Sequence, residues 1–442
     1  MTEFEVLPRY EAYRDSGIEW LGRIPSDWKV IPLRYLAKVQ TGNTPSKNID
    51  SYYSKYEGLP WIKPDELNEF KKLFSSKEKL TKKGVKEARI IPKNSVLVCC
   101  IGTIGKIGVA GCHLSTNQQI NSITFMGNVN PSFAKYLIFS SSIEHEKLAN
   151  GNVVKILNTN TQKSIHLVIP SKIEQTAIAN FLDKETQRID ALVEEKKDFI
   201  KLLKEKRQVL ISHSVTQGLD PTVKMKDSGV DWLGEVPKHW QVKKIKHLFQ
   251  IRKRIAGKLG FPVLSITQKG IKVKDTVTGT GQLSMDYSKY QIVKVGDFAM
   301  NHMDLLTGYV DLSLFHGVTS PDYRVFTLTD SDSVDRYYLY LMQMGYKDKI
   351  FFAYGQGVAN IGRWRFQTEA FSNFKIPYPD KKEQQEIVDF LDSQMTKLDS
   401  LTEETQTSID LLKEHRSALI SAAVTGKIDV SKEAIKHEKT QL

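Results

Sequence analysis

Cysteine is scarce in this 442-residue chain, which contains only Cys99, Cys100 and Cys112. An odd number of cysteines clustered in one half excludes a disulfide framework and fits a reducing cytoplasm. Cys99, Cys112 and His113 match no common zinc-binding spacing, and burial in an apolar strand is the favoured role for the cysteines. We expect no metal site.

Long apolar runs are also missing. No stretch approaches the ~18 residues that a membrane span needs. The first residues, Met1–Gly17, are acidic and aromatic and lack the apolar core of a secretory signal. We therefore expect a cytoplasmic protein without a membrane anchor.

Catalytic motifs are equally scarce. Ser320–Tyr323 is not the Asn/Asp-Pro-Pro-aromatic motif of a DNA adenine methyltransferase, and Gly279–Gly281 and Gly102–Lys106 depart from nucleotide-binding glycine loops. Pro64–Asp65 and Glu69–Lys71 imitate a nuclease pattern, but they lie too close in sequence to place two strands around a metal. Because short motifs match easily by chance, we predict that the chain is not an enzyme.

Positive charge, in contrast, is abundant. Lys and Arg total 63 against 51 Asp and Glu, so the net charge is +12 and the pI is about 9.2. A protein this basic commonly binds a polyanion, and nucleic acid is the first candidate. The alternative is solubilising charge, since the lysines are spread along the whole chain.

Two long helices are predicted 209 residues apart, from Glu174 to about Thr216 and from Glu383 onward. Apolar residues recur in each at steps of three and four, which is typical of a coiled coil. A helix of that length extends roughly 60 Å at about 1.5 Å per residue and needs a partner to bury its apolar seam. The residues expected to pair the helices are Leu182, Ile189, Leu192, Phe199, Leu203, Leu210, Leu391, Leu398, Leu401, Leu412 and Leu419.

A second repeat shows that the whole chain is duplicated. The segment DSGIEWLGRIPSDW at Asp15–Trp28 returns as DSGVDWLGEVPKHW at Asp227–Trp240, with eight of fourteen positions identical. The offset of 212 here and 209 at the helices indicates a globule followed by a helix, twice. The motif itself is predicted to be structural, because its glycines and proline suit turns and its tryptophans suit a small apolar cluster.

Between these markers the two globules differ in sequence, although both have the apolar runs and turns of short strands. Few helical stretches are expected in the globules, with one helix from Pro131 to about Leu148 and another near Val334–Met344. The expected strands include Val96–Ile101, Ile107–Ala110 and Tyr323–Leu328. We predict an α+β fold of two mostly-β globules separated by two long helices, which pair as an antiparallel coiled coil with pseudo-twofold symmetry.

Amide and basic side chains in turn-rich segments are candidates for contacts to DNA bases and phosphates. In the first globule they are Lys47, Lys63, Lys106, Asn117, Gln118, Gln119, Asn152 and Lys155. In the second they are Arg252, Lys253, Arg254, Gln268, Lys269, Asn301, His302, Asn360, Arg363 and Arg365. For each residue the alternative is a solvated surface or a satisfied turn, and Asn117–Gln119 could equally pin a loop to the core.

The tandem DSGxxWLGxxPxxW segments, the EQ…I…FLD helix starts and the LLKE…LI…VT helix ends resemble the specificity (S) subunit of type I restriction-modification systems. The strings TGNTP at Thr41–Pro45, IGTIGKIG at Ile101–Gly108, NQQI at Asn117–Ile120 and GVTSPDYRVF at Gly317–Phe326 are similar to strings of that family. The resemblance covers nearly the whole chain. It implies target recognition domains at 1–170 and 227–379, conserved helices at 171–217 and 380–426, a linker at 218–226 and a tail at 427–442.

The resemblance also implies function. Each recognition domain would bind one half of a split DNA site, and the two domains would prefer different half-sites. The helices would set the spacer, within a footprint on the order of 15 to 18 base pairs at ~3.4 Å per step. Two methyltransferase (M) subunits and, in the larger complex, restriction (R) subunits would be partners that carry S-adenosylmethionine, ATP and Mg, with no cofactor on this chain. The alternative is a stand-alone DNA-binding regulator or architectural protein.

Overall fold

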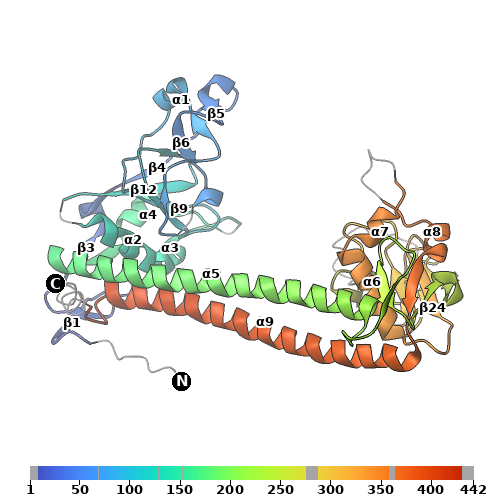
Figure 1. Ribbon diagram of the computed structural model, residues 1–442. Helices are drawn as coiled ribbons and strands as arrows, with labels where there is room; N and C mark the ends of the chain where they lie inside the picture. Colours follow the sequence, from blue (N-terminus) through green and yellow to red (C-terminus); the bar gives the residue numbers. More distant parts are fainter. Residues whose placement is uncertain are drawn as a thin grey trace. The chain divides into compact units, whose positions relative to one another are not determined.

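The computed structural model describes residues 8–67, 69–127, 129–151, 153–274, 287–357 and 364–430 (Figure 1). It divides into two compact units. The first comprises Met1–Lys196 and Thr407–Leu442, and the second comprises Lys197–Gln406. The boundaries fall inside the long helices, so each unit contains one globule together with half of each helix.

The first globule is built on a five-stranded sheet in the order β4-β12-β9-β10-β7 and a four-stranded sheet in the order β11-β6-β8-β5. Its larger sheet has a fully buried centre, since every residue of β9 and β10 is buried. The strands are β1 Tyr13–Asp15, β2 Arg23–Pro25, β3 Lys29–Pro32, β4 Ala37–Thr41, β5 Tyr53–Ser54, β6 Leu59–Ile62, β7 Lys72–Leu73, β8 Lys79–Leu80, β9 Val96–Cys99, β10 Ile107–Ala110, β11 Ser115–Thr116, β12 Ile120–Phe125 and β13 His166–Ile169. The helices are α1 Lys82–Lys86, α2 Pro131–Ser140, α3 Ser142–Leu148 and α4 Thr159–Lys163, with 3-10 turns η1 Leu33–Tyr35, η2 Asp50–Tyr52 and η3 Pro64–Glu66.

The single helix expected over Pro131–Leu148 is in fact two helices. Helix α2 ends at Ser140 and α3 begins at Ser142, so the break falls at Ser141. The Ser141 hydroxyl donates to the Ile138 carbonyl at 2.8 Å, and side-chain bonds of this kind compete with the helical ladder. The strand expected at Ile107–Ala110 has the bounds that the sequence predicted.

The second globule contains a four-stranded sheet in the order β17-β24-β21-β22 and several two-stranded pairs. Its strands are β14 Met225–Asp227, β15 Glu235–Pro237, β16 Gln241–Lys244, β17 Phe249–Arg252, β18 Leu264–Thr267, β19 Gly270–Val273, β20 Gln291–Val293, β21 Phe298–Met300, β22 Val310–Leu312, β23 Gly317–Thr319, β24 Arg324–Leu328 and β25 Lys375–Tyr378. Its helices are α6 Asp335–Lys347, α7 Ile350–Ala353 and α8 Thr368–Asn373, with the turn η4 Ile245–His247. Aromatic rings fill its core, where Phe249 contacts Phe298, Phe326 and Tyr338 edge to face.

The repeated tryptophan motif joins each globule to the start of its own long helix. Trp28 is 1% exposed and donates from Nε1 to Glu174 at 3.2 Å; Trp240 is 0% exposed and donates to Glu383 at 2.8 Å. The following glutamines act in parallel, because the side-chain oxygen of Gln175 accepts from Asn130 N and that of Gln384 accepts from Val334 N. These contacts explain the Glu-Gln pair at both helix starts.

The aspartate of each FLD string makes a second connection of this kind. Asp183 accepts hydrogen bonds from Lys135 and Tyr136, at 2.5 and 2.6 Å. Asp392 accepts from Arg336 and Tyr340, each at 2.6 Å. Each carboxylate therefore receives one cation and one tyrosine hydroxyl from a helix of its own globule.

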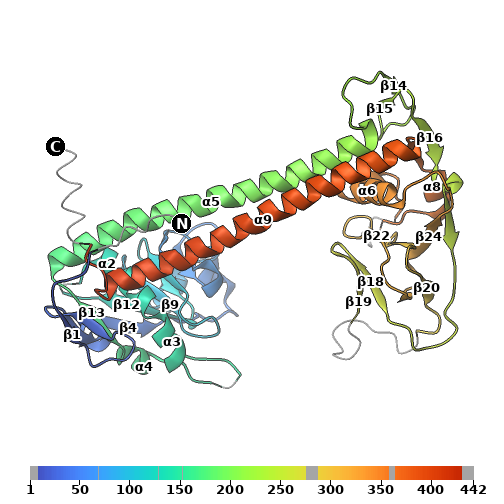
Figure 2. The same ribbon diagram turned by 90° about the horizontal axis from the view of Figure 1, so that it is seen from below.

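The long helices are α5 Lys172–Gln217 and α9 Lys381–Val424. In the first unit the start of α5 lies beside the end of α9, and in the second the end of α5 lies beside the start of α9, so the halves pair antiparallel (Figure 2). Leu182, Ile189, Leu203, Leu391, Leu398 and Leu419 are buried, whereas Leu192, Leu210 and Leu412 are half-buried. Phe199 and Leu401 are 44% and 42% exposed and form no part of the buried seam.

An arginine-aspartate ion pair crosses between the helices in each unit. Arg416 pairs with Asp190 in the first unit, with 3.0 Å between nitrogen and oxygen, and Arg207 pairs with Asp399 in the second. Because these residues are related by the 209-residue offset, the two pairs are copies of one contact. The ion pair of the first unit has additional contacts, since Arg416 also pairs with Glu69 and lies 4.6 Å from the centre of the Phe70 ring.

We expect Arg416→Ala to destabilise the protein by about 1 to 3 kcal/mol and the matched Arg207→Ala by less than about 1 kcal/mol. The Arg416 side chain is 9% exposed and its removal leaves two carboxylates and an aromatic ring without their partner, whereas Arg207 is 34% exposed. Urea denaturation followed by circular dichroism would measure both. Equal losses for the two variants would contradict this ranking.

Within the described ranges, no helix combines the length and the apolar character that crossing a membrane requires.

Candidate nucleic-acid interface

Two loops of the first globule, at Thr41–Pro45 and Asn117–Ile120, are pinned to one another. Asn43 N donates to the Thr116 carbonyl at 2.9 Å, and the Thr44 hydroxyl donates to the side chain of Gln118. Gly42 lies so close to this second loop that a Cβ would come within 2.1 Å of the Thr116 hydroxyl. The loops therefore approach at backbone distance, which only glycine permits at that position.

Asn117 contributes to the same arrangement. Its side chain is 7% exposed, its Nδ2 donates to Gln119 at 2.9 Å and its Oδ1 accepts from Gln119 N. These contacts support the alternative in which Asn117 belongs to a satisfied turn. Gln118 is the exposed member of the three.

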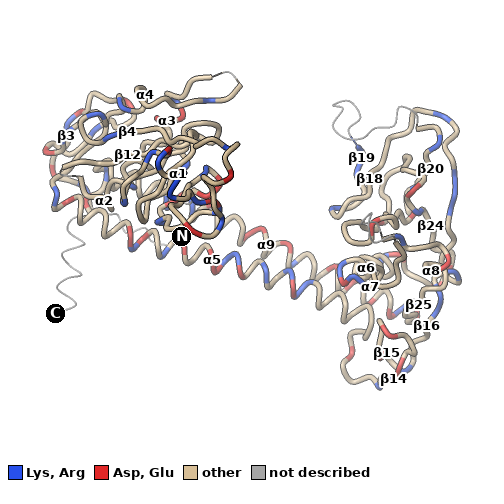
Figure 3. Tube along the Cα trace, turned by 90° about the horizontal axis from the view of Figure 1, so that it is seen from above, with Lys and Arg blue, Asp and Glu red and all other residues tan. Residues whose placement is uncertain are grey.

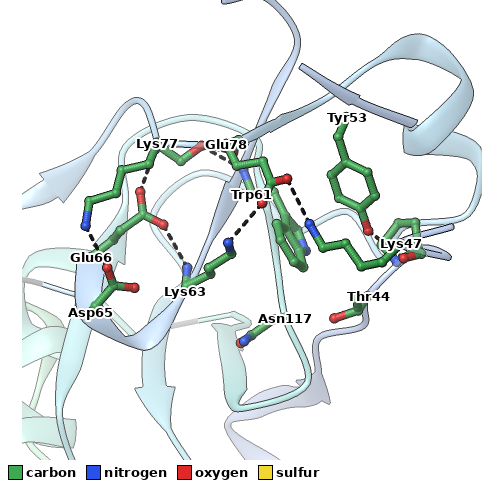
Figure 4. Close-up of polar contacts among 12 residues, drawn as sticks. Thr44, Lys47, Tyr53, Trp61, Lys63, Asp65, Glu66, Lys77, Glu78 and Asn117 are labelled. Atoms are coloured by element: carbon green, nitrogen blue, oxygen red, sulfur yellow. Dashed lines mark hydrogen bonds and ion pairs between the residues drawn. The ribbon is translucent and has the colours of Figure 1, made fainter. Parts of the chain in front are cut away.

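Lysines and carboxylates cluster over an aromatic base beside these loops (Figure 4). Lys47 and Lys63 contact different oxygens of Glu78, at 2.8 and 2.9 Å. Both ammonium groups also lie over the Trp61 ring, at 4.5 and 5.0 Å from its centre. Burial acts to raise the pKa of the Glu78 carboxyl, but hydrogen bonds from the two lysines outweigh it and the pKa is lowered. Glu78 thus stays ionised and partly neutralises both lysines.

The nuclease-like residues nearby have structural partners. Asp65 pairs with Lys77 at 2.7 Å, and Glu69 pairs with Arg416. Across the described ranges, no group of three or more His, Cys, Asp or Glu side chains is placed to hold a metal ion. These carboxylates therefore take part in ion pairs of the fold.

Basic residues of the second globule fall into paired and exposed groups. Arg254 forms an ion pair with Asp297, which is 3% exposed, and Arg252 donates to the Thr327 hydroxyl at 2.8 Å. Lys253, between them in sequence, is exposed. Lys253 is therefore the member of this trio that is open to a ligand.

A buried arginine that the sequence pattern did not single out lies at the start of β24. Arg324 is 4% exposed, and its guanidinium donates to the Phe366 carbonyl at 2.8 Å and lies 4.4 Å over Phe371. Burial lowers its pKa to about 10. The residues that follow it, Val325–Leu328, are typical of a buried strand. Nothing in the sequence, however, predicted that Arg324 itself is buried.

His302 is close enough to this arginine to be affected by its charge. Burial, and then the charges of Arg324 and Arg365, lower the pKa of His302 to about 4. The imidazole is therefore neutral at physiological pH, and it would contact DNA as a hydrogen-bonding group and not as a cation.

Comparison with known proteins identifies the architecture that carries these residues. A family model described as the type I restriction modification DNA specificity domain matches residues 25–202 and again residues 237–411. The chain belongs to this family.

Curated relatives have the corresponding names. The type I restriction enzyme MjaIX specificity subunit of Methanocaldococcus jannaschii is 29% identical over 256 residues, which cover 56% of this chain and 57% of that protein. The MjaVIII specificity subunit of the same organism is 23% identical over 436 residues and covers 92% of this chain and 94% of that protein. The chain thus spans little more than half of the first relative and nearly all of the second.

Solved structures share the fold. A chain from a study of complex assembly and conformational transition of the type I R-M system has a TM-score of 0.65 at 14% identity, covering 91% of this chain and 98% of that one. The HsdS subunit from Thermoanaerobacter tengcongensis has a TM-score of 0.51 at 15% identity, covering 92% and 98%. At these identities the likeness concerns the fold alone.

In the two specificity domains the remaining candidate residues are distributed as follows. Lys155, Gln268, Lys269 and Arg365 are exposed, Lys106 donates to the Pro64 carbonyl at 3.0 Å, and Asn301 is half-buried with its Oδ1 accepting from Met303 N. Asn152, Asn360 and Arg363 lie outside the described residues. Contacts of all these residues with DNA stay predictions.

Lys and Arg occur throughout both specificity domains and along the helices (Figure 3). The strings that carry the family resemblance mostly build the scaffold: Trp28, Glu174 and Asp183 and their counterparts connect globule to helix, and the loops at 41–45 and 117–120 hold each other. Apart from Gln118, the exposed candidate residues lie outside those strings.

Proposed function

We propose that this chain is the non-catalytic DNA specificity subunit of a type I restriction-modification enzyme. Each specificity domain binds one half of a split DNA sequence, and the paired helices set the unrecognised spacer and dock methyltransferase subunits. Membership of the specificity-domain family, with two matched regions, is the observation that carries the proposal.

The division into two units supports this assignment. Each unit has its own apolar core and its own set of exposed basic and amide side chains, as expected of two domains that each bind one half-site. The two cores differ in strand order and composition, which favours two different half-sites. The excess of Lys and Arg supplies the phosphate affinity that any DNA sequence shares.

Partners follow from the same proposal. Double-stranded DNA, two methyltransferase subunits and, in the full assembly, restriction subunits would bind this chain. S-adenosylmethionine, ATP and Mg would reside on those partners, because the chemistry of methyl transfer and of translocation would be theirs.

The proposal predicts a methylation pattern. DNA from cells that express this chain with its cognate methyltransferase subunit is expected to carry N6-methyladenine in a split motif, and cells that express either protein alone are expected to lack it. Methylation mapping at single-base resolution measures both half-sites and the spacer at once. Absence of new methylation, with a methyltransferase subunit shown to be folded, would overturn the proposal and favour a stand-alone DNA-binding regulator.

A further inference from the structure

One segment of the first specificity domain is far more basic than its surroundings. Residues 77–89 contain six Lys or Arg against two Glu. The segment runs through β8, Lys79–Leu80, and α1, Lys82–Lys86, and Figure 3 shows Lys and Arg along α1. In the first unit, α1 and β5 lie at the end of the globule away from α5 (Figure 1).

The lysines before α1 are already engaged. Lys77 pairs with Asp65 at 2.7 Å, and Lys79 donates to the Tyr56 carbonyl at 2.7 Å. Lys47 and Lys63 share Glu78 (Figure 4). Asp65 and Glu78 are therefore already occupied by these lysines.

The lysines of α1 itself are different. Lys82, Lys83 and Lys86 are exposed, and among the described residues no carboxylate lies within ion-pair distance of any of them. Lys86 lies four residues after Lys82 and three after Lys83, so these like charges repel one another on the helix surface. An anionic partner would remove that repulsion.

Two sets of contacts fix the position of α1 and therefore of its three lysines. Thr81 caps α1, accepting from Gly84 N and donating from its hydroxyl to the Ser51 carbonyl at 2.7 Å. Gly84 lies against η2, where a Cβ would come within 2.3 Å of the Tyr52 carbonyl oxygen. The glycine side of α1 therefore faces η2.

An exposed tyrosine lies on the turn between β5 and β6. The Tyr56 side chain is 86% exposed, on a turn where Ser54 Oγ accepts from both Tyr56 N and Glu57 N at 3.2 Å. The turn is joined to the start of α1 because Ser54 pairs with Lys79 across β5 and β8. An exposed aromatic side chain on an ordered turn is typical of an interface residue.

We propose that Lys82, Lys83 and Lys86 form a phosphate-binding site for one strand of duplex DNA, with the ring of Tyr56 packing against the adjoining sugars. This inference rests on the proposed function and deepens it. The site positions the first specificity domain on DNA without selecting sequence, since phosphates carry no base information. It differs from the candidates that the sequence favoured, Lys47 and Lys63, because those two lysines are partly neutralised by Glu78.

The test measures DNA affinity of the complex with its methyltransferase subunits as a function of salt. In the triple variant Lys82→Gln, Lys83→Gln, Lys86→Gln, the slope of log K against log salt should fall in magnitude by about 2 to 3, because each phosphate contact contributes about 0.9. Affinity near physiological salt should fall about 10- to 100-fold for the same reason. The methylated motif should be unchanged.

A matched control removes the same charge elsewhere in the domain. Lys71→Gln, Lys72→Gln, Lys93→Gln replaces three other exposed lysines and should keep the wild-type slope. The variant Lys82→Arg, Lys83→Arg, Lys86→Arg keeps the positive charge and should therefore keep the wild-type slope. Comparison with it separates loss of the phosphate contact from loss of folding. Tyr56→Ala should weaken binding by about 3- to 10-fold with no change in slope, because the contact is uncharged.

An unchanged slope in the triple glutamine variant, or an equal fall in the control, would overturn the assignment. A triple variant that binds DNA normally but loses its methyltransferase subunits would show that the patch docks an acidic protein surface, which also overturns it. Failure of the proposed function is distinguishable, because it would appear as a wild-type complex without a methylated split motif, whatever the slopes.

Discussion

Removing one heptad from both long helices is expected to shorten the unmethylated spacer by about three base pairs and to leave both half-sites unaltered. Seven residues correspond to about 10 Å of helix, and one base pair to ~3.4 Å. Residues 194–200 of α5 and 403–409 of α9 are suitable, since they are related by the 209-residue offset. Methylation of the original motif should fall to background.

The ion pairs between the helices explain why both helices must be changed. Asp190 and Arg207 are 17 residues apart on α5, and Asp399 and Arg416 are 17 residues apart on α9. The paired deletions leave these separations equal, so Arg416–Asp190 and Arg207–Asp399 can both form. Deleting the heptad from α5 alone makes them unequal and is expected to abolish methylation at any split motif.

Mapping methylated adenines in cells that express each variant with the methyltransferase subunit measures this result. Inserting a heptad at the same two places should lengthen the spacer by about three base pairs. Altered half-sites with an unchanged spacer would rule out the helices as the determinant of spacing.

Replacing Trp240 by alanine is expected to destabilise the protein by about 3 to 5 kcal/mol, the usual cost of removing a large buried aromatic side chain. Trp240 is 0% exposed, its Nε1 donates to Glu383 at 2.8 Å, and a Cβ built on Gly218, the residue after α5, would lie 3.4 Å from its ring. One side chain therefore joins the second globule to the start of α9 and to the end of α5. Urea denaturation followed by circular dichroism gives the free energy of unfolding.

Two variants separate the apolar contribution from the hydrogen bond. Trp240→Phe retains most of the buried surface and loses the indole N–H, so a smaller loss of about 1 to 2 kcal/mol is expected. Trp28→Ala removes the equivalent side chain of the first unit, which is 1% exposed, and should cost about as much as Trp240→Ala. A cost below about 1 kcal/mol for Trp240→Ala would contradict a joining role.

The duplication, the two long helices and the mixed globules could be predicted from the sequence because each depends on local periodicity or on repetition. Leu182 and Leu391 lie at matched positions of the repeat, and both are buried. The exposure of Phe199 and Leu401 could not be predicted in this way. A heptad pattern marks which residues share a helix face, but the partner helix and the globule decide how far that face is covered.

The candidate DNA contacts show the same limit more strongly. Lys47 and Lys63 have the composition of phosphate contacts, yet the fold brings Glu78 between them from fifteen residues beyond Lys63. Lys82, Lys83 and Lys86 were not among the candidates from the sequence, and only their unpaired position on a fixed helix distinguishes them. Charge is a property of sequence, but the availability of a charge depends on which carboxylates the chain brings near it.

The sequence by itself determined that this protein is a tandem duplication, that each copy has a long helix with a Glu-Gln pair near its start, and that its net charge is strongly positive. These properties follow from repetition, periodicity and composition, which need no knowledge of contacts between distant residues. The tertiary structure alone decided that Trp28 and Trp240 bond to those glutamates, that Arg416 and Arg207 cross between helices, and which lysines remain free. Those features join residues up to 226 positions apart, and only packing brings such residues together.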